Sequence, residues 1–435
     1  MIAKDIVDFL SDLVRIDTTN PPGNETAAAQ YVKRVLESQG LPARVYEAAP
    51  GRGSVICRLK GNGTKRPLML LSHLDVVNAQ PQMWSHPPFS GDVIDGVVWG
   101  RGSRDCKGLT AMEMAVLLEV KKNGLELGRD LILAATADEE SGGRMGVGWL
   151  CENVPDETDA EFCINEGGGS GLNLGTATVF TCNTAEKGVS RLRLVARGEP
   201  GHAAIPRSNT AVAKLAEAVV RLSSRRLPIH ETPTVRKYLD TVVEATGLPR
   251  SSAGVLFHPS LGEGVLPTVI PDRHLRDTIN AMLRNTATPT ILKAGYRINV
   301  IPEEATAEVD GRILPGQSPE DLAREVRDLV GDLVEVHLVS KGTGSESPMD
   351  TDLYRAIEET VRQAVPGAVV APVLSTGATD AKFLRARGTV TYGFAPGLPG
   401  EPSDTAHGID ERHSAASLEF GFKTLYQLVK RLCTE

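Results

Sequence analysis

The sequence predicts an α/β fold in which a mixed, mostly parallel sheet is flanked by helices and a smaller α/β domain is inserted into the chain. Three observations support this prediction. The chain before Gly188 alternates helical and strand patterns, the pattern changes after Gly188, and helices and a strand of the first kind return from about Glu346. Helices that alternate with short apolar strands are typical of a mostly parallel sheet covered on both faces. We therefore expect three segments: 1–187 and 346–435 as two parts of one domain, and 188–345 as an inserted lid.

In the first segment, apolar periodicity predicts four helices and short apolar runs predict four strands. The helices are expected from Ala3 to Val14, Glu25 to Gln39, Gly108 to Asn123 and near Gly146 to Glu152, and the strands at 54–59, 67–73, 130–137 and 160–165.

In the lid, four strands and two helices are expected. The strands are 190–198, 290–302, 304–315 and 333–340, and the helices are Asn209 to Leu222 and Pro319 to Val330. The stretch from Arg225 to Thr290 has no clear period and is predicted to be mostly helical. The last segment is expected to hold a helix at 353–365, a strand at 389–394 and a helix at 415–432.

Charge and composition restrict the kinds of partner. The net charge of -8 and the pI of about 5.7 argue against nucleic acid or an anionic membrane, because both attract basic surfaces. The N-terminus has acidic residues at helical spacing and so differs from a signal peptide, and no apolar run is long enough to span a bilayer. The six cysteines form neither CxxC pairs nor a disulfide framework, which predicts free thiols and a cytoplasmic location.

Most of the informative residues are carboxylates and histidines that follow apolar runs, where an α/β sheet binds its ligands. Any one of them alone is more often a surface charge or a structural histidine, but their joint placement favours a divalent metal site for zinc, cobalt or manganese. They are His73, Asp75, Asp105, Glu139, Glu140, Glu166 and His407.

The motifs around these residues resemble metallopeptidase family 20, which includes aminoacylases, acetylornithine deacetylases, succinyl-diaminopimelate desuccinylases and glutamate carboxypeptidases. The resemblance covers the whole chain and rests on HLDVV, GRGSRDCKG, ADEESGG, INEGG, GHAAIP, INVIPEEATAEVDGRILPG and AHGIDE, in that order. It implies a zinc-peptidase-like fold with a dimerisation-type lid. It also implies that the first and last segments form the catalytic, metal-binding domain.

The resemblance implies two zinc ions and an amide hydrolysis driven by metal-activated water. His73 and Glu166 would bind one ion, Glu140 and His407 the other, and Asp105 would bridge them. Asp75 would hold the ring of His73. Glu139 would act as the general base that takes the proton of the water and returns it to the leaving amine.

The resemblance also implies residues that contact substrate. His202 resembles a histidine that stabilises the oxyanion, in several members from the partner subunit, although a turn residue is the simpler interpretation. Asn299 and Arg312 match lid positions, where a guanidinium suits a substrate carboxylate; the alternative for Arg312 is a salt bridge with Asp310. Gly377 and Thr379 match a substrate-side loop.

Two features differ from many members of the family. Cys106 follows the bridging aspartate, where it is expected as a small packed residue in preference to a soft metal ligand. The long segment before the INVIP motif resembles the carboxypeptidase S and N-acyl amino acid hydrolase branch.

We therefore expect hydrolysis of N-acyl amino acids or small peptides that carry a free carboxylate. The alternatives are an acetylornithine deacetylase or succinyl-diaminopimelate desuccinylase activity and, less favoured, a non-catalytic binding protein. A homodimer through the lid is expected as well.

Overall fold

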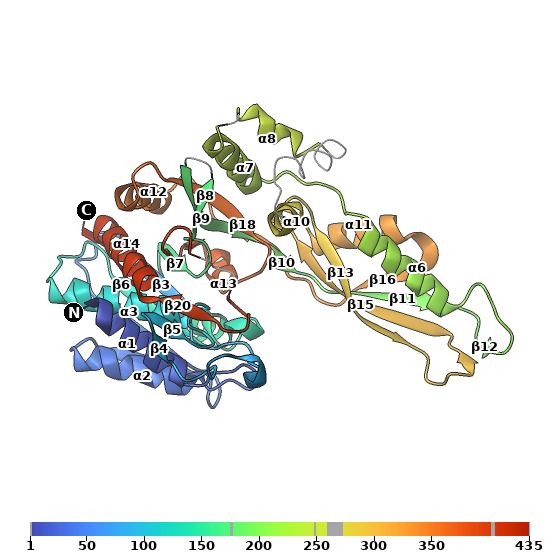
Figure 1. Cartoon of the computed structure of the whole chain (residues 1–435), viewed down its shortest axis with the longest axis horizontal. Coiled ribbons are helices and arrows are strands. Elements are labelled where there is room, and N and C mark those ends of the chain that lie inside the picture. Colours follow the sequence, from blue (N-terminus) through green and yellow to red (C-terminus); the bar gives the residue numbers. More distant parts are fainter. Residues whose placement is uncertain (1, 175–176, 248, 259–272, 402–404, 435) are drawn as a thin grey trace.

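A computed structural model describes residues 2–174, 177–247, 249–258, 273–401 and 405–434. Its largest element is a ten-stranded mixed sheet, from which a narrower arm extends to one side (Figure 1). The strands follow the order β1-β2-β6-β3-β7-β19-β9-β17, with β8 and β18 also paired to β9. They are β1 (Ala43–Glu47), β2 (Gly53–Leu59), β3 (Leu68–His73), β6 (Leu131–Thr136), β7 (Phe162–Asn165), β8 (Gly171–Leu174), β9 (Ala177–Glu186), β17 (Ser345–Glu346), β18 (Val369–Ser375) and β19 (Val390–Gly393).

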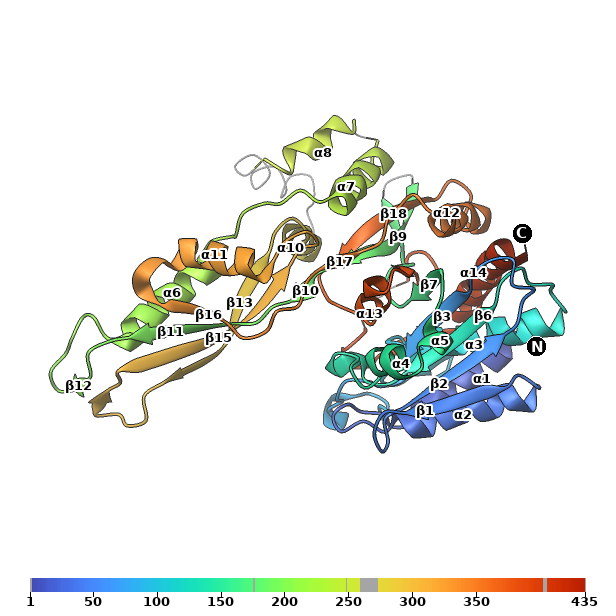
Figure 2. The same ribbon diagram turned by 180° about the vertical axis from the view of Figure 1, so that it is seen from behind.

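Helices cover both faces of this sheet, because its central strands are apolar on both sides. In β3, Leu68 and Leu70 pack into the core under one set of helices, and Met69 and Leu71 pack into the core under the other. The first set is α1 (Ile2–Arg15), α2 (Glu25–Ser38), α3 (Lys107–Lys122), α12 (Asp352–Ala364) and α14 (Ala415–Thr434). The second set, seen from behind in Figure 2, is α4 (Val147–Asn153) and α13 (Ala381–Ala386), with α5 (Pro155–Thr158) beside α4.

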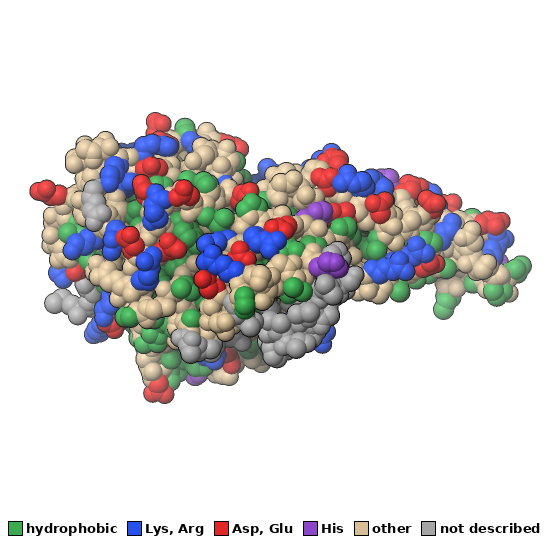
Figure 3. Space-filling view, turned by 90° about the horizontal axis from the view of Figure 1, so that it is seen from above, with side chains coloured by type: hydrophobic (Ala, Val, Ile, Leu, Met, Phe, Trp, Pro, Cys, Tyr) green, Lys and Arg blue, Asp and Glu red, His purple; other side chains and the backbone are tan. Residues whose placement is uncertain are grey.

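The arm contains a five-stranded antiparallel sheet with its own core. Its strands are β10 (Gly188–Val189), β11 (Leu192–Arg197), β13 (Thr286–Ala294), β15 (Glu304–Ile313) and β16 (Glu335–Leu338), and its helices are α6 (Ala211–Ser224) and α11 (Pro319–Val330). A capping box starts α11: the Ser318 hydroxyl accepts from the Asp321 N–H, and the Asp321 carboxylate accepts from the Ser318 N–H. In the space-filling view, basic and acidic side chains are interspersed along the arm (Figure 3).

The expected strand 290–302 is wrong in its extent. The chain turns after β13, and β14 (Val300–Ile301) pairs with β12 (Gly201–His202) as a separate two-stranded ladder at the far end of the arm (Figure 1). Gly295, at φ +66, stands at this turn, where a residue with a side chain would be strained.

The stretch predicted to be mostly helical contains α7 (Pro233–Ala245), α8 (Ser251–Val255) and α10 (Arg273–Met282); residues 248 and 259–272 lie outside the described residues. Their apolar side chains pack against β9 and β18 of the large sheet as well as against Leu314 of the arm. The segment 188–345 therefore contributes to both sheets, and its boundaries as an independent lid stay a prediction.

A small three-stranded sheet joins distant parts of the chain near the large sheet: β4 (Val93–Ile94), β5 (Val97–Trp99) and β20 (Arg412–Ser414). None of the described helices is long and apolar enough to cross a membrane. All six cysteines are free thiols, as expected, and the cytoplasmic location stays a prediction.

Candidate metal centre

Three neighbouring parallel strands bring most of the predicted ligands to one edge of the large sheet. The strands β6, β3 and β7 are adjacent and parallel. His73 is the last residue of β3, Glu139 and Glu140 follow β6, and Glu166 follows β7. Parallel strands end at a common edge, which is why three separate apolar runs in the sequence lead to one site.

Asp105 lies between two groups of potential ligand atoms. One group contains His73, Glu166 and Asp105 together with Cys106, and the other contains Glu140, His407 and Asp105; the ligand atoms within each group lie within 4.8 Å of one another. Nε2 of His73 is 2.9 Å from Oδ1 of Asp105, whereas Nε2 of His407 is 3.1 Å from Oδ2. The two oxygens of one carboxylate thus face two different histidines, as a bridging ligand requires.

The electrostatics of this centre favour cations. Hydrogen bonds that the His407 ring donates to the carboxylates of Asp105 and Glu140 raise the pKa of His407 to about 10. The carboxylates that hold a proton on this ring would hold a divalent ion equally well, so metal binding would release that proton. Burial raises the pKa of Glu139, and the negative charge of Glu166 adds to that effect.

Asp75 differs in detail from its expected role. Nδ1 of His73 is 2.9 Å from the backbone oxygen of Asp75, whereas the Asp75 carboxylate is farther away, at 3.5 Å. The carboxylate instead accepts from the N–H groups of Glu139 and Glu140 at 3.1 and 3.0 Å, and from the Asn20 amide at 2.8 Å. The carbonyl therefore fixes the tautomer of His73, and the carboxylate positions the glutamate pair.

Gly143, the second of the two glycines after the glutamate pair, allows this loop to approach Asp380. Gly143 has φ +73, and a Cβ there would lie 1.9 Å from Oδ1 of Asp380. A residue with a side chain would push the loop, and with it Glu139 and Glu140, away from the sheet edge.

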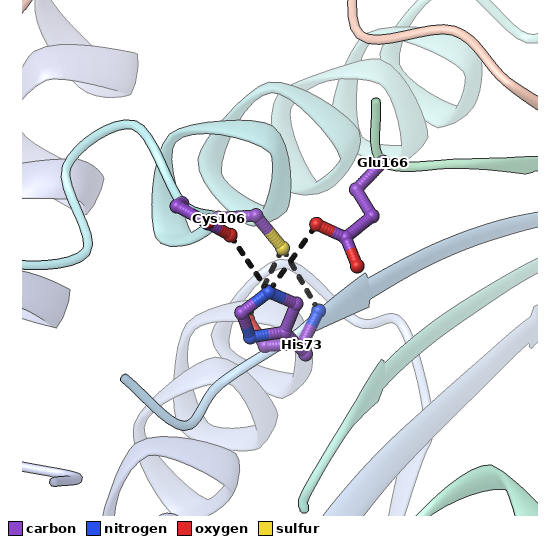
Figure 4. A group of neighbouring side chains, drawn as sticks. His73, Cys106 and Glu166 are labelled. Atoms are coloured by element: carbon purple, nitrogen blue, oxygen red, sulfur yellow. Dashed lines mark hydrogen bonds and ion pairs between the residues drawn. The ribbon is translucent and has the colours of Figure 1, made fainter. Parts of the chain in front are cut away.

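Cys106 is packed against the backbone of His73. Its Sγ accepts from the His73 N–H at 3.1 Å, and Figure 4 shows Cys106 and Glu166 on either side of this histidine. Burial raises the pKa of the Cys106 thiol, which keeps it protonated. This arrangement agrees with the expected packing role.

Glu411 is a residue of the site that the sequence patterns did not reveal. Its carboxylate, fully buried, accepts from the backbone N–H groups of Gly102, Arg104 and Asp105 at 2.8 to 3.1 Å, and from the Arg101 guanidinium at 2.7 Å. The residue stands four positions after His407. Its position at the end of the AHGIDE motif was the available signal, but a lone glutamate there has no spacing that distinguishes it from a surface charge.

Of the predicted substrate residues, one lies beside this centre. Arg312 lines a cleft that Glu139 and Glu140 also line, and its guanidinium forms a two-point ion pair with Asp310 at 2.6 and 3.2 Å. The Thr379 hydroxyl donates to the buried carboxylate of Glu186 at 2.8 Å. The N–H of Gly377 donates to the hydroxyl of Ser375, the last residue of β18.

His202 and Asn299 lie elsewhere. His202 is in β12 at the far end of the arm, and the N–H of Ala203 donates to the backbone oxygen of Asn299 at 3.1 Å (Figure 1). Nδ1 of His202 accepts from the N–H of Ala204, which is a turn contact. Within one chain, these two residues are therefore not brought to the metal centre.

An α/β sheet with paired carboxylate and imidazole groups at its parallel edge defines the class of metal-dependent hydrolases that act on amide or peptide bonds. The profile of peptidase family M20/M25/M40 matches residues 69–431, and the chain belongs to this family.

Relatives with two kinds of name align over most of the chain. The human N-fatty-acyl-amino acid synthase/hydrolase PM20D1 is 30% identical over 448 residues, which cover 98% of this chain and 88% of the relative. The probable carboxypeptidase S-like 2 of Dictyostelium discoideum is 29% identical, over 87% of this chain and 74% of the relative.

Solved structures agree with the fold. The M20 family metallo-carboxypeptidase Sso-CP2 from Sulfolobus solfataricus superposes with a TM-score of 0.72 at 18% identity, over 98% of each chain. The Bacillus subtilis YXEP protein, a dinuclear metal-binding peptidase of the family, superposes with a TM-score of 0.62 at 13% identity, over 99% of this chain and 98% of that one. These comparisons confirm the predicted fold class and the predicted family.

Proposed function

We propose that this chain hydrolyses the amide bond of N-acyl amino acids or small peptides that carry a free carboxylate, with two zinc ions. The observation that carries the proposal is the placement of Asp105 between His73 and His407, each facing a different carboxylate oxygen. His73, Glu166 and Asp105 would hold one ion, and Glu140, His407 and Asp105 the other. Nitrogen and oxygen ligands of this kind suit zinc, with cobalt or manganese as alternatives.

Bound divalent ions supply Lewis-acid polarisation of the scissile carbonyl and acidify water. The residues of the chain position the reacting groups and transfer the proton. Asp75 fixes the backbone of Glu139 and Glu140, so that Glu140 would be available to hold a metal ion and Glu139 would stay free. Glu139 would take the proton of the attacking water and deliver it to the leaving amine nitrogen, and its raised pKa suits both steps.

The names of the relatives support the choice of substrate class. The human relative acts on N-fatty-acyl amino acids and the Dictyostelium relative is a carboxypeptidase S-like protein, and both names describe amide bonds next to an amino acid. We infer the same class of bond for this chain, with the acyl group left open.

The test of this proposal is the variant Glu139→Gln, assayed after loading with zinc. We expect kcat to fall by at least about 100-fold, because a positioned general base contributes that much or more. Metal content, measured by elemental analysis, should equal that of the wild type. The exposed Glu152→Gln serves as the control and should keep full activity. A Glu139→Gln enzyme with wild-type activity would contradict the catalytic role and favour a non-catalytic binding protein.

The substrate class is tested by measuring the turnover of different substrates by the wild type in the same assay. We expect turnover of N-acyl amino acids or dipeptides to exceed that of acetylornithine and succinyl-diaminopimelate. A preference for either of the last two would favour the specific deacylases instead.

We also propose that the chain forms a homodimer through its arm. Among the described residues, β13 pairs with β15 alone, so its other edge is open. Ile291 and Leu292 on this strand are more than half exposed, and Tyr296 and Ile298 at the following turn are 81% and 101% exposed. Apolar side chains in such positions fit a contact with a second copy, and His202 on the same arm would then lie near the partner's centre.

A further inference from the structure

A cleft of about 690 Å³ runs between the two sheets, beside the candidate metal centre. Glu139 and Glu140 line its side toward the large sheet. Lys187, Gly188 and Arg312 line its side toward the arm. A ligand in this cleft would contact the proposed general base and these cations at the same time.

Lys187 is an unusual residue of this cleft. It connects β9 of the large sheet to β10 of the arm, and its side chain is only 1% exposed. Among the residues that the structure describes, its Nζ has one hydrogen-bond contact, a long one of 3.4 Å to the hydroxyl of Thr286. Within the described part of the chain, no carboxylate forms an ion pair with it.

The two charged groups that act on the pKa of Lys187 are both cations. Burial lowers the pKa of Lys187 to about 7, and the guanidiniums of Arg312 and Arg284 add to that effect. A buried ammonium without a counter-ion is costly, and proteins usually pair such a group. A bound anion would provide the missing partner.

Two other cations that line the cleft, Arg144 and Arg191, are exposed to solvent, and three more have partners. Arg312 is held by the two oxygens of Asp310, Lys341 pairs with Glu320 at 2.8 Å, and Lys382 donates to the backbone oxygen of Thr379 at 3.1 Å. The guanidinium that the sequence indicated as the carboxylate ligand is therefore compensated within its own strand. Lys187 is the buried cation of this cleft that lacks an acidic partner.

We propose that Lys187 binds the free carboxylate of the substrate. The scissile amide of the substrate would then be directed to the metal centre at the other side of the cleft. This inference rests on the proposed hydrolysis of N-acyl amino acids and names the residue that selects for their charge. Because Lys187 joins the two sheets, a carboxylate bound there would contact the chain where the arm begins.

The experiment compares the zinc-loaded wild type with Lys187→Met, on the best N-acyl amino acid of the substrate panel and on its carboxamide, which has no charge. For the acid, we expect KM to rise roughly 10- to 100-fold in the variant, as for loss of a charge-assisted hydrogen bond, while kcat changes by less than about threefold. For the carboxamide, wild type and variant should have the same kcat/KM.

A matched control and a stability measurement separate binding from structure. Lys341→Met removes a cation that lines the same cleft and has a partner, so its KM should stay within about threefold of the wild type. Lys187→Met should melt at the same temperature as the wild type or higher, because methionine fills the space without a buried charge. A purely structural lysine would give a lower melting temperature and an unchanged KM.

Two results would overturn the inference: a KM for the acid that Lys187→Met leaves unchanged, or equal losses for acid and carboxamide. Both presuppose a wild type that hydrolyses the acid. A metal-loaded wild type without such activity would refute the proposed function itself, together with this inference.

Discussion

Lys187 has a second consequence at the scale of a single residue, because its burial links folding to pH. In the folded protein the pKa of Lys187 is about 7, against an ordinary value of 10.5. Between these values the unfolded chain binds more protons than the folded one, so the contribution of Lys187 becomes less unfavourable as pH rises. Below pH 7 both states are protonated and the full penalty remains.

We predict that Lys187→Met is more stable than the wild type at pH 6, and that this advantage shrinks from pH 7 to pH 10. The change can reach about 1.4 kcal/mol per pH unit. Arginine side chains in general stay charged throughout this range, and the two guanidiniums that lower the pKa of Lys187 are present in both proteins, so the difference between the two proteins isolates Lys187. Urea unfolding at pH 6, 8 and 10 measures it. A stability difference independent of pH would mean that Lys187 titrates normally in the folded protein.

The candidate ligands could be predicted from sequence because each follows a short apolar strand, and strand ends have fixed positions in a parallel sheet. Lys187 could not. Its position follows a strand that was itself not predicted, and its lack of an acidic partner depends on side chains more than 90 residues away, such as Thr286. The ion pair of Arg312 with Asp310 could be predicted as the alternative to substrate binding, since residues two apart in a strand point to the same face.

At the scale of elements, Glu411 joins two loops from opposite parts of the chain. The loop before α3 carries Asp105, and the loop before β20 carries His407. The four hydrogen bonds that the Glu411 carboxylate accepts all come from the first loop. This contact positions the backbone of Asp105 relative to the loop that carries the exposed His407.

We predict that Glu411→Gln weakens the binding of the ion held by Asp105, Glu140 and His407 by roughly 10- to 100-fold, the range seen for partners of metal ligands. The amide can accept at one oxygen only, and its NH2 group would face N–H donors. Zinc titration of the apoprotein against a chromophoric chelator measures the affinity of each of the two metal sites. The control is Glu419→Gln, a half-buried glutamate of α14 that pairs with Lys423, and this variant should bind metal normally. Equal affinities in Glu411→Gln and the wild type would show that the two loops are held by other contacts.

The elements themselves were predictable where a segment had a clear period, as for α1, α3 and α14 or the buried run of β3. Strand β18 was missed because Pro372 interrupts it, and proline is excluded from most central strands. The structure explains the exception, since β18 pairs with β9 alone. Strand β9 was missed as well, and with it the surface on which α7 and α8 pack.

At the scale of the whole molecule, His202 lies far from the metal centre of its own chain, so any role in catalysis depends on how two copies assemble. β12 lies at the far end of the arm, whereas the candidate ligands lie at the edge of the large sheet (Figure 1). A histidine that acts on the substrate from there would have to serve the centre of a second copy. The proposed homodimer through the arm allows this arrangement, and a mixing experiment tests it.

We predict that His202→Ala and Glu139→Gln each have low activity alone and regain activity when they are unfolded, mixed and refolded together with zinc. In a mixed dimer, the centre with an intact Glu139 would receive His202 from the other copy, whereas the second centre would lack both groups. Random pairing makes half of the dimers mixed, so about a quarter of the wild-type activity should return. Each variant refolded alone controls for recovery without exchange, and light scattering reports the dimer. If His202 instead acts within its own chain, every centre in the mixture lacks one group, and no activity returns.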